Sequence, residues 1–219
     1  MSTNLLTSES KFLERARIAL TNAESHTEIK PLISEFGMDE TKISEGWTIF
    51  NKAEASLNTS KQEDIEKKVS SNSYKLTFEE FLGLFKRHRN QSLIFFKKHP
   101  DFLVKLGIKG SFPNQYNKIF DNAKHFYSAI QKHSDIQEKL LLCKITPETV
   151  IDCLAKRENV MSLRATFDKE SGEAQDATVQ KNLNLIELKE WIEDFVIIAK
   201  IALYDKPQLL ESLGIFVRS

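Results

Sequence analysis

The chain of 219 residues carries 31 basic and 31 acidic side chains, and 41% of its residues are hydrophobic. This apolar fraction is sufficient for a packed core and argues against disorder, whereas the balanced charge argues against a general nucleic-acid binder. Only seven glycines and five prolines are present, fewer than the turns of an all-β or α/β chain require. The composition therefore predicts an all-α protein of one or two domains.

Neither a secretory signal nor a membrane span is indicated. Charged residues interrupt residues 1–20. The most apolar window, residues 191–204, contains two acidic residues and a lysine, which makes it too polar to cross a bilayer. The two cysteines, Cys143 and Cys153, are too few for a disulfide framework. We therefore expect a cytoplasmic protein with free thiols and no contact with a membrane.

The predicted helices form two sets that are offset by 107 residues. In chain order, apolar spacing predicts the first set over about 7–25, 28–36, from 40 onward, 78–98 and 100–106. The second set covers about 114–132, 135–143, from 147 onward, 185–205 and 207–213. The clearest repeat is the pattern P-x-x-L-x-x-L-G-I, which runs from Pro100 to Ile108 and again from Pro207 to Ile215. We infer an internal duplication.

Residues that start and stop helices recur at the same offset. Asp39 and Thr146 are suited to cap the N-terminus of the third helix of each set, and Pro147 suits a first helical position. Gly107 and Gly214 follow the last helix of each set and are expected to end it. Agreement between caps and apolar faces strengthens the prediction of duplication.

Two alternatives exist for the helices that begin near residues 40 and 147. Thr77 followed by Glu80, and Asn184 followed by Glu187, predict that separate helices start there, since the first pair forms a capping box and the second resembles it. The polar run at 58–64 and Gly172 predict a kink or break near 58–62 and 168–173. Alternatively, each helix is long and uninterrupted.

The repeat predicts two tandem helical bundles with up-and-down antiparallel helices, residues 1–109 and residues 110–219. A unit of about 107 residues is large enough to bury its own core. The alternative architecture is a short α-solenoid of stacked helical hairpins.

Sequence motifs of the common enzyme classes are absent. No histidine follows a glutamate by three positions, as di-metal carboxylate bundles require, and no phosphate-binding loop or nucleophile elbow occurs. The weak candidates for a metal site are His26 with Glu28 and His133 with Asp135. The competing interpretation is that each histidine forms a corner between two helices. His88, on an apolar helix face, is expected to belong to the core.

These features predict a non-enzymatic helical interaction or scaffold protein that binds another protein or a second copy of itself. The sequence indicates no catalytic residue, no cofactor and no nucleic-acid partner. One alternative is a bundle that binds an apolar small molecule between its helices. The other is a metal-dependent enzyme that uses the two histidine corners.

Overall fold

The computed structural model describes the backbone of residues 2–215 and the side chains of residues 8–215. The described residues form helices and no strand, which confirms the all-α prediction. None of these helices is both long and apolar enough to cross a lipid bilayer. The elements in chain order are α1 (Ser2–Ser25), α2 (Ile29–Ser34), α3 (Glu40–Phe95), α4 (Pro100–Lys105), α5 (Tyr116–Lys132), α6 (Ser134–Leu140), the short 3₁₀ helix η1 (Leu141–Cys143), α7 (Pro147–Ala202) and α8 (Leu209–Ser212).

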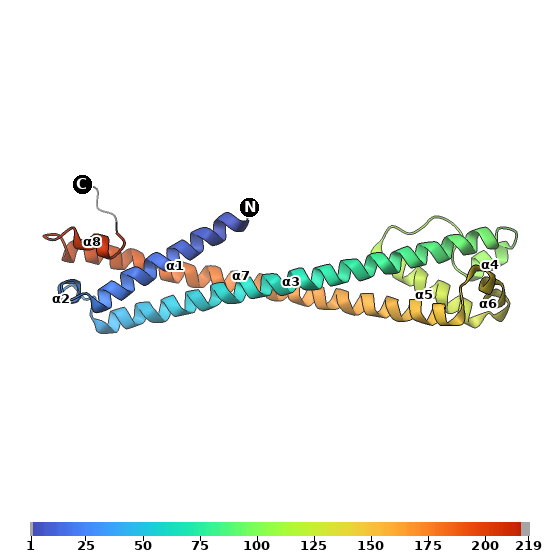
Figure 1. The fold of residues 1–219 in the computed structure, drawn as a ribbon, viewed down its shortest axis with the longest axis horizontal. Coiled ribbons are helices and arrows are strands. Elements are labelled where there is room, and N and C mark those ends of the chain that lie inside the picture. Colours follow the sequence, from blue (N-terminus) through green and yellow to red (C-terminus); the bar gives the residue numbers. More distant parts are fainter. Residues whose placement is uncertain (1, 216–219) are drawn as a thin grey trace. The chain divides into compact units, whose positions relative to one another are not determined.

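Helices α3 and α7 are continuous over 56 residues each (Figure 1). The predicted breaks near 58–62 and 168–173 are therefore wrong. The polar run at 58–64 contains neither proline nor glycine, so polarity alone does not interrupt the backbone ladder. Gly172 costs a helix only about 1 kcal/mol relative to alanine, which is too little to end a helix that is packed on both sides of it.

The predicted helix starts at Thr77 and Asn184 are also wrong, because both residues lie inside long helices. The Thr77 hydroxyl donates to the carbonyl oxygen of Ser73 at 2.8 Å. Threonine inside a helix can satisfy its hydroxyl on the preceding turn in this way, so a capping-box sequence is not sufficient to start a helix. The predicted helices 78–98 and 185–205 are the second halves of α3 and α7.

Other predicted helix ends are confirmed. Asp39 Oδ1 accepts a hydrogen bond from the Lys42 N–H at 2.9 Å. Thr146 accepts one from the Thr149 N–H at 3.2 Å. Gly107 and Gly214 adopt left-handed φ angles of 65° and 72°, the conformation in which glycine ends a helix at no steric cost.

The chain folds into two compact units. Unit 1 comprises Met1–Asp64 and Glu173–Ser219, and unit 2 comprises Ile65–Gly172. This division differs from the predicted domains, 1–109 and 110–219, because α3 and α7 each begin in one unit and end in the other. Each unit is therefore built from elements of both predicted domains.

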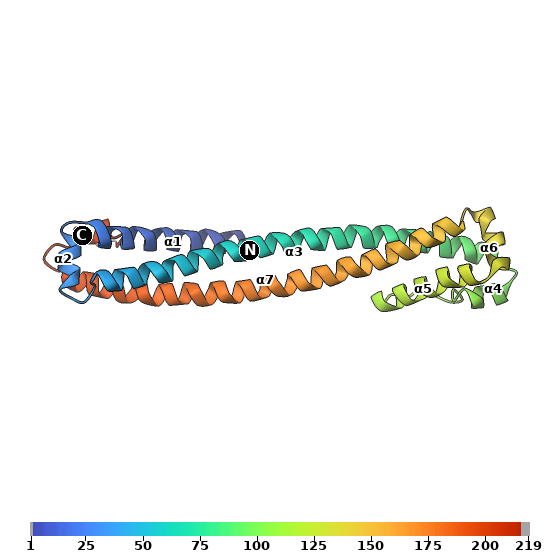
Figure 2. The same ribbon diagram turned by 90° about the horizontal axis from the view of Figure 1, so that it is seen from below.

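Unit 1 contains α1, α2, α8, the first half of α3 and the second half of α7. In both views α2 and α8 lie at the same end of this unit (Figures 1 and 2). Its core is mainly aliphatic and draws on both segments of the chain: Leu13, Leu20, Ile29, Ile33, Ile43, Phe50, Leu57, Leu188, Phe195, Leu203 and Leu213.

Unit 2 contains α4, α5, α6, η1, the second half of α3 and the first half of α7. Helices α4 and α6 lie at the same end of this unit (Figures 1 and 2). Its core is rich in aromatic rings and takes up several of the 15 phenylalanines of the chain. The core comprises Tyr74, Phe81, Phe85, Phe96, Phe102, Phe120, Phe126 and Tyr127, with Ile130, Leu140, Val150 and Val160.

Candidate functional site

The first predicted metal corner lies in unit 1, where His26 separates α1 from α2. Its Nδ1 atom is 3.3 Å from the backbone nitrogen of Glu28 and 3.4 Å from that of Ile29, and both N–H groups donate to it. The Glu28 carboxylate accepts a hydrogen bond from Lys206 Nζ at 2.7 Å, which lowers the pKa of Glu28. The imidazole therefore helps to start α2, and the carboxylate has its own cation.

The second predicted corner lies in unit 2. His133 precedes α6 with an extended backbone and makes no side-chain capping bond. Asp135 lies 3.9 Å from Lys105 Nζ. The four predicted residues thus form two separate pairs in different units, and the metal site at each pair stays a prediction.

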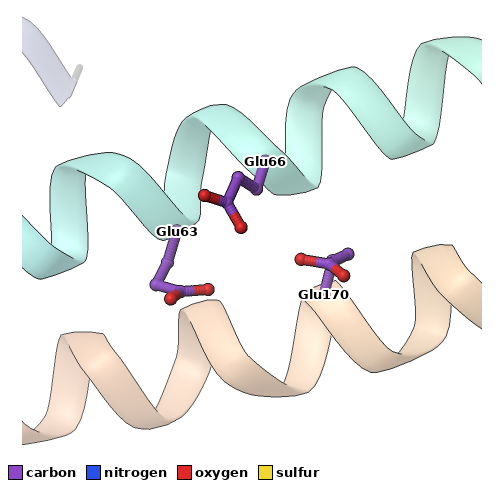
Figure 3. A group of neighbouring side chains, drawn as sticks. All are labelled: Glu63, Glu66 and Glu170. Atoms are coloured by element: carbon purple, nitrogen blue, oxygen red, sulfur yellow. The ribbon is translucent and has the colours of Figure 1, made fainter.

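Carboxylates also gather where α3 and α7 run through unit 2 (Figure 3). Glu66 and Glu170 carry carboxylate oxygens within 4.8 Å of each other. Figure 3 also labels Glu63, which precedes Glu66 by one helical turn on α3. Lys169 Nζ lies 3.5 Å from Glu170. Groups of acidic side chains are common on helix surfaces without any ion, so this geometry by itself does not define a metal site.

His88 belongs to the core of unit 2, as expected. It is 6% exposed, and its Nδ1 lies 3.0 Å from the Tyr127 hydroxyl oxygen and 3.9 Å from Cys153 Sγ. Burial lowers the pKa of His88 and raises the pKa of the Tyr127 hydroxyl and of the Cys153 thiol. All three groups are therefore neutral near pH 7 and satisfy one another within a closed core.

Residues 86–89 of α3 read Lys-Arg-His-Arg, and two of these basic side chains make contacts within unit 2. Arg89 is buried and donates to the carbonyl oxygens of Ile108 and Gly110 at 3.0 and 2.5 Å. Lys86 Nζ lies 5.3 Å from the centre of the Phe112 ring, and the Arg89 guanidinium carbon lies 5.7 Å from it. These cations hold the segment between α4 and α5 against α3.

The most distinctive surface is an apolar row on the part of α7 that belongs to unit 1. We call it the α7 stripe. Consecutive members are three or four residues apart, except for one step of eleven residues, which is close to three helical turns, so they lie on one face. Their exposed fractions range from 53% to 82%: Val179, Leu183, Ile186, Ile197, Ile201 and Tyr204, which lies just beyond the end of the helix.

An open groove adjoins the α7 stripe in unit 1. Its volume is about 420 Å³, and Phe12 of α1 faces Leu185 and Ile186 of α7 across it. Polar side chains at its rim are Ser8, Glu9, Asn182 and Lys189. Lys181 and Glu9, 2.9 Å apart, join the two helices nearby. The groove shares Ile186 with the stripe and so adds Phe12 and Leu185 to the apolar surface at the N-terminal half of the stripe.

Unit 2 has a groove of about 360 Å³ that corresponds to the groove of unit 1, because four of its lining positions lie 107 residues from lining positions of the unit 1 groove. The matching pairs are Tyr116 with Glu9, Ile119 with Phe12, Phe78 with Leu185 and Leu82 with Lys189. Here Phe112 and Pro113, from the segment before α5, form one wall. The Phe112 ring lies 5.6 Å from the ring of Phe85 on α3. In unit 2, therefore, the chain itself places an aromatic side chain beside the groove.

A smaller cavity of about 210 Å³ lies between α1, α2 and α3 in unit 1. Trp47 and Glu24 line it and are joined by a hydrogen bond of 3.0 Å from the indole N–H to the carboxylate. Lys30, Asp39 and Glu40 also face it. This lining is more polar than an apolar ligand would require.

Comparison with family models, with curated proteins and with solved structures finds no significant match to this chain. Apolar spacing predicted a helix over about 185–205 but did not identify the α7 stripe, because it does not show which apolar face is buried. The available signal was a second apolar face on the same helix, at 179, 183, 186, 197 and 201.

Proposed function

We propose that the chain is a helical protein-interaction module and that the α7 stripe of unit 1 is its docking surface. The observation that carries this proposal is the row of six large apolar side chains, each more than half exposed, of which five lie on one face of α7 and Tyr204 lies just beyond its end. Single exposed apolar residues are ordinary on protein surfaces, whereas contiguous apolar patches mark sites of interaction.

The face of α3 that corresponds to the α7 stripe allows a comparison between the two long helices. Leu76 and Ile94, which precede Leu183 and Ile201 by 107 residues, are 64% and 78% exposed. Between them on that face are Glu79, Gly83, Lys86 and Asn90, so Leu76 and Ile94 are separated from each other. Ile65 and Val69, 53% and 60% exposed, precede Leu76 on the same face. At the positions that correspond to Ile186 and Ile197, however, α3 carries Glu79 and Asn90, so the two long helices differ there.

The energy available at the stripe is sufficient for binding. Fully burying an aliphatic side chain is worth roughly 1.5–3 kcal/mol, so the exposed half of each side chain is worth about 1 kcal/mol. Removing two of them should cost about 2 kcal/mol, which corresponds to roughly a 30-fold loss of affinity.

Site-specific photo-crosslinking tests the proposal. A photoreactive amino acid at Ile197, within the stripe, should crosslink one defined partner, which is identified by mass spectrometry and then purified. The same probe at Asn90, on the corresponding face of α3, should not crosslink it. In titration calorimetry with the purified partner, Leu183→Gln with Ile201→Gln should weaken binding by roughly 30-fold, and Leu76→Gln with Ile94→Gln should leave it unchanged. Equal effects of the two pairs would contradict the proposal.

We also infer that the chain is internally duplicated. The first and last residues of α3, Glu40 and Phe95, become those of α7, Pro147 and Ala202, when 107 is added. Under this inference, each compact unit combines the first half of one repeat with the second half of the other. The repeats would then be exchanged within one chain, as in a domain-swapped dimer of shorter chains.

The alternative functions have weaker support. The unit 1 cavity presents charged side chains from Glu24, Lys30 and Asp39, which suit a polar ligand better than an apolar one. A metal-dependent enzyme is disfavoured because Glu28 is paired with Lys206 and the two histidine corners belong to different units. A cytoplasmic location agrees with two free cysteines, one of them buried.

A further inference from the structure

We propose that the partner of the α7 stripe is a basic amphipathic helix. This inference rests on the proposed docking function and identifies the partner by its charge and its shape. Three observations lead to it: the spacing of the stripe, the acidic residues that interrupt and flank it, and the comparison with the corresponding groove of unit 2.

The spacing suits a helical partner. Positions 179, 183, 186, 190, 193, 197, 201 and 204 follow one another at intervals of three or four residues, which is the seam along which two helices pack. The seam covers 25 residue steps and is about 38 Å long at 1.5 Å per residue. An amphipathic helix of similar length can bury its apolar face along this line, a common mode of peptide recognition.

Two positions of the seam are acidic. Glu190 and Glu193 stand between the apolar residues Ile186 and Ile197, and both are exposed. Glu190 forms no ion pair within the described part of the chain. Glu193 is 3.7 Å from Lys189, but both side chains are more than 60% exposed, so this pair neutralises the carboxylate only weakly. An apolar partner would bury these carboxylates without compensation, at high cost.

The flanks of the seam add to the negative charge. Asp176, Glu187 and Asp194 are exposed beside it on one side, and Lys189 and Lys200 on the other. Together with the two glutamates of the seam, this gives five acidic and two basic side chains. Glu187 is paired with Lys52 at 2.9 Å. A partner with lysine or arginine opposite the centre of the seam would complement the remaining carboxylates and would exclude acidic competitors.

A second copy of the chain is a poor occupant for the same reason. Whether two α7 helices ran parallel or antiparallel about the centre of the seam, the glutamates at 190 and 193 of one copy would face those of the other. Like charges in a helix–helix seam are destabilising. The acidic centre therefore favours a different chain with basic residues.

Unit 2 shows the complementary chemistry. There Lys86 and Arg89 of α3 hold Phe112 beside the groove, with cation-to-ring distances of 5.3 and 5.7 Å. At the positions 107 residues later, α7 carries Glu193 and Val196. The helix supplies both cations in unit 2, whereas the matching positions of unit 1 carry a carboxylate and a valine, and Lys189 is the cation that lines its groove. A docked basic partner would supply the charge that α3 supplies in unit 2.

Three synthetic helical peptides of about four heptads test the inference on the full-length protein. They share leucine at the outer seam positions and carry lysine, glutamine or glutamate at the two central seam positions and at the remaining surface positions. Fluorescence anisotropy at about 50 mM salt should show the lysine peptide binding at least tenfold more tightly than the glutamine peptide, with the glutamate peptide weakest. Raising the salt to about 500 mM should reduce this preference, because exposed charges are screened.

Charge variants assign the preference to the seam. Glu190→Gln with Glu193→Gln should bring the lysine and glutamine peptides to within about threefold of each other. Glu79→Gln with Glu80→Gln changes the net charge equally on exposed residues of α3 and should keep the tenfold preference. Analytical ultracentrifugation should find no self-association through the stripe.

The outcomes separate this inference from the proposed function. If the glutamine peptide binds as tightly as the lysine peptide, and Leu183→Gln with Ile201→Gln weakens both, the docking surface stands and the basic partner is refuted. Self-association abolished by the same apolar substitutions would also refute it in favour of a second copy. If no peptide binds the full-length protein, the basic helix and the docking surface both fail.

Discussion

Cutting the chain between Lys109 and Gly110 separates residues that the compact units bring together. The predicted domains 1–109 and 110–219 would each fold alone after this cut. The compact units imply the opposite, because unit 1 needs Glu173–Ser219 and unit 2 needs residues of α3 from Ile65 onward. We expect neither fragment to fold by itself into a stable monomer.

The core of unit 1 indicates how much stability fragment 1–109 would lose. Fragment 1–109 lacks five large buried side chains of that core, which are at most 6% exposed in the intact chain: Leu188, Phe195, Leu203, Leu210 and Leu213. At roughly 1.5–3 kcal/mol for each, the loss is roughly 8–15 kcal/mol. This equals the whole free energy of unfolding of a typical domain, about 5–15 kcal/mol.

Circular dichroism and light scattering provide the assay. Each fragment alone should lack a cooperative thermal transition as a monomer, and mixing the two at equal concentration should restore helical signal in a 1:1 complex. As a control, a protease site placed at 109/110 should be cut in the folded protein without separating the fragments. A monomeric fragment 1–109 that melts cooperatively within a few degrees of the intact protein would refute the reasoning.

Further predictions concern single residues. Gly46→Ala should destabilise the protein by about 1–3 kcal/mol, since the added Cβ would lie 2.5 Å from a tryptophan ring of α7. At Gly172 an added Cβ would meet no atom within 4 Å, so Gly172→Ala should stabilise the protein by about 0.5–1 kcal/mol. Urea unfolding measures both changes, and a Gly46→Ala variant more stable than Gly172→Ala would contradict the helix packing. Asp39→Ala should lower the free energy of unfolding by about 1 kcal/mol, because it removes a helix cap. Thr77→Ala should change the free energy of unfolding by less than about 0.5 kcal/mol, and a larger loss would mean that Thr77 caps a helix. Because burial lowers the pKa of His88 in the folded state, the unfolded state takes up the proton first, so stability should fall as the pH drops below about 6.5, by at most about 1.4 kcal/mol per pH unit. In His88→Gln this contribution should vanish, and an unchanged pH profile would show that other groups cause it.

Local features of the backbone could be predicted because their causes are local. The carboxylate of Asp39 and the hydroxyl of Thr146 reach N–H groups only three residues away. Gly107 and Gly214 permit left-handed φ angles that other residues adopt only with strain. Such features need no knowledge of the distant chain.

The continuity of α3 and α7 could not be predicted from the same local signals. Thr77 has the sequence context of a cap, but its hydroxyl bonds to a carbonyl within the helix. The polar stretch at 58–64 is compatible with both helix and turn. Packing of the flanking segments into two separate cores decides in favour of one helix, since most helix stability in proteins comes from tertiary contacts.

The sequence by itself determined the all-α class, the helix ends at Asp39, Gly107 and Gly214, and the similarity of positions 107 residues apart. Only the tertiary structure decided which segments share a core and which face of α7 stays exposed. Leu183 and Leu188 are the same residue type on one helix, yet Leu188 is fully buried and Leu183 is 55% exposed. The hydrophobic effect has no direction, so an apolar side chain specifies burial only once its neighbours are in place.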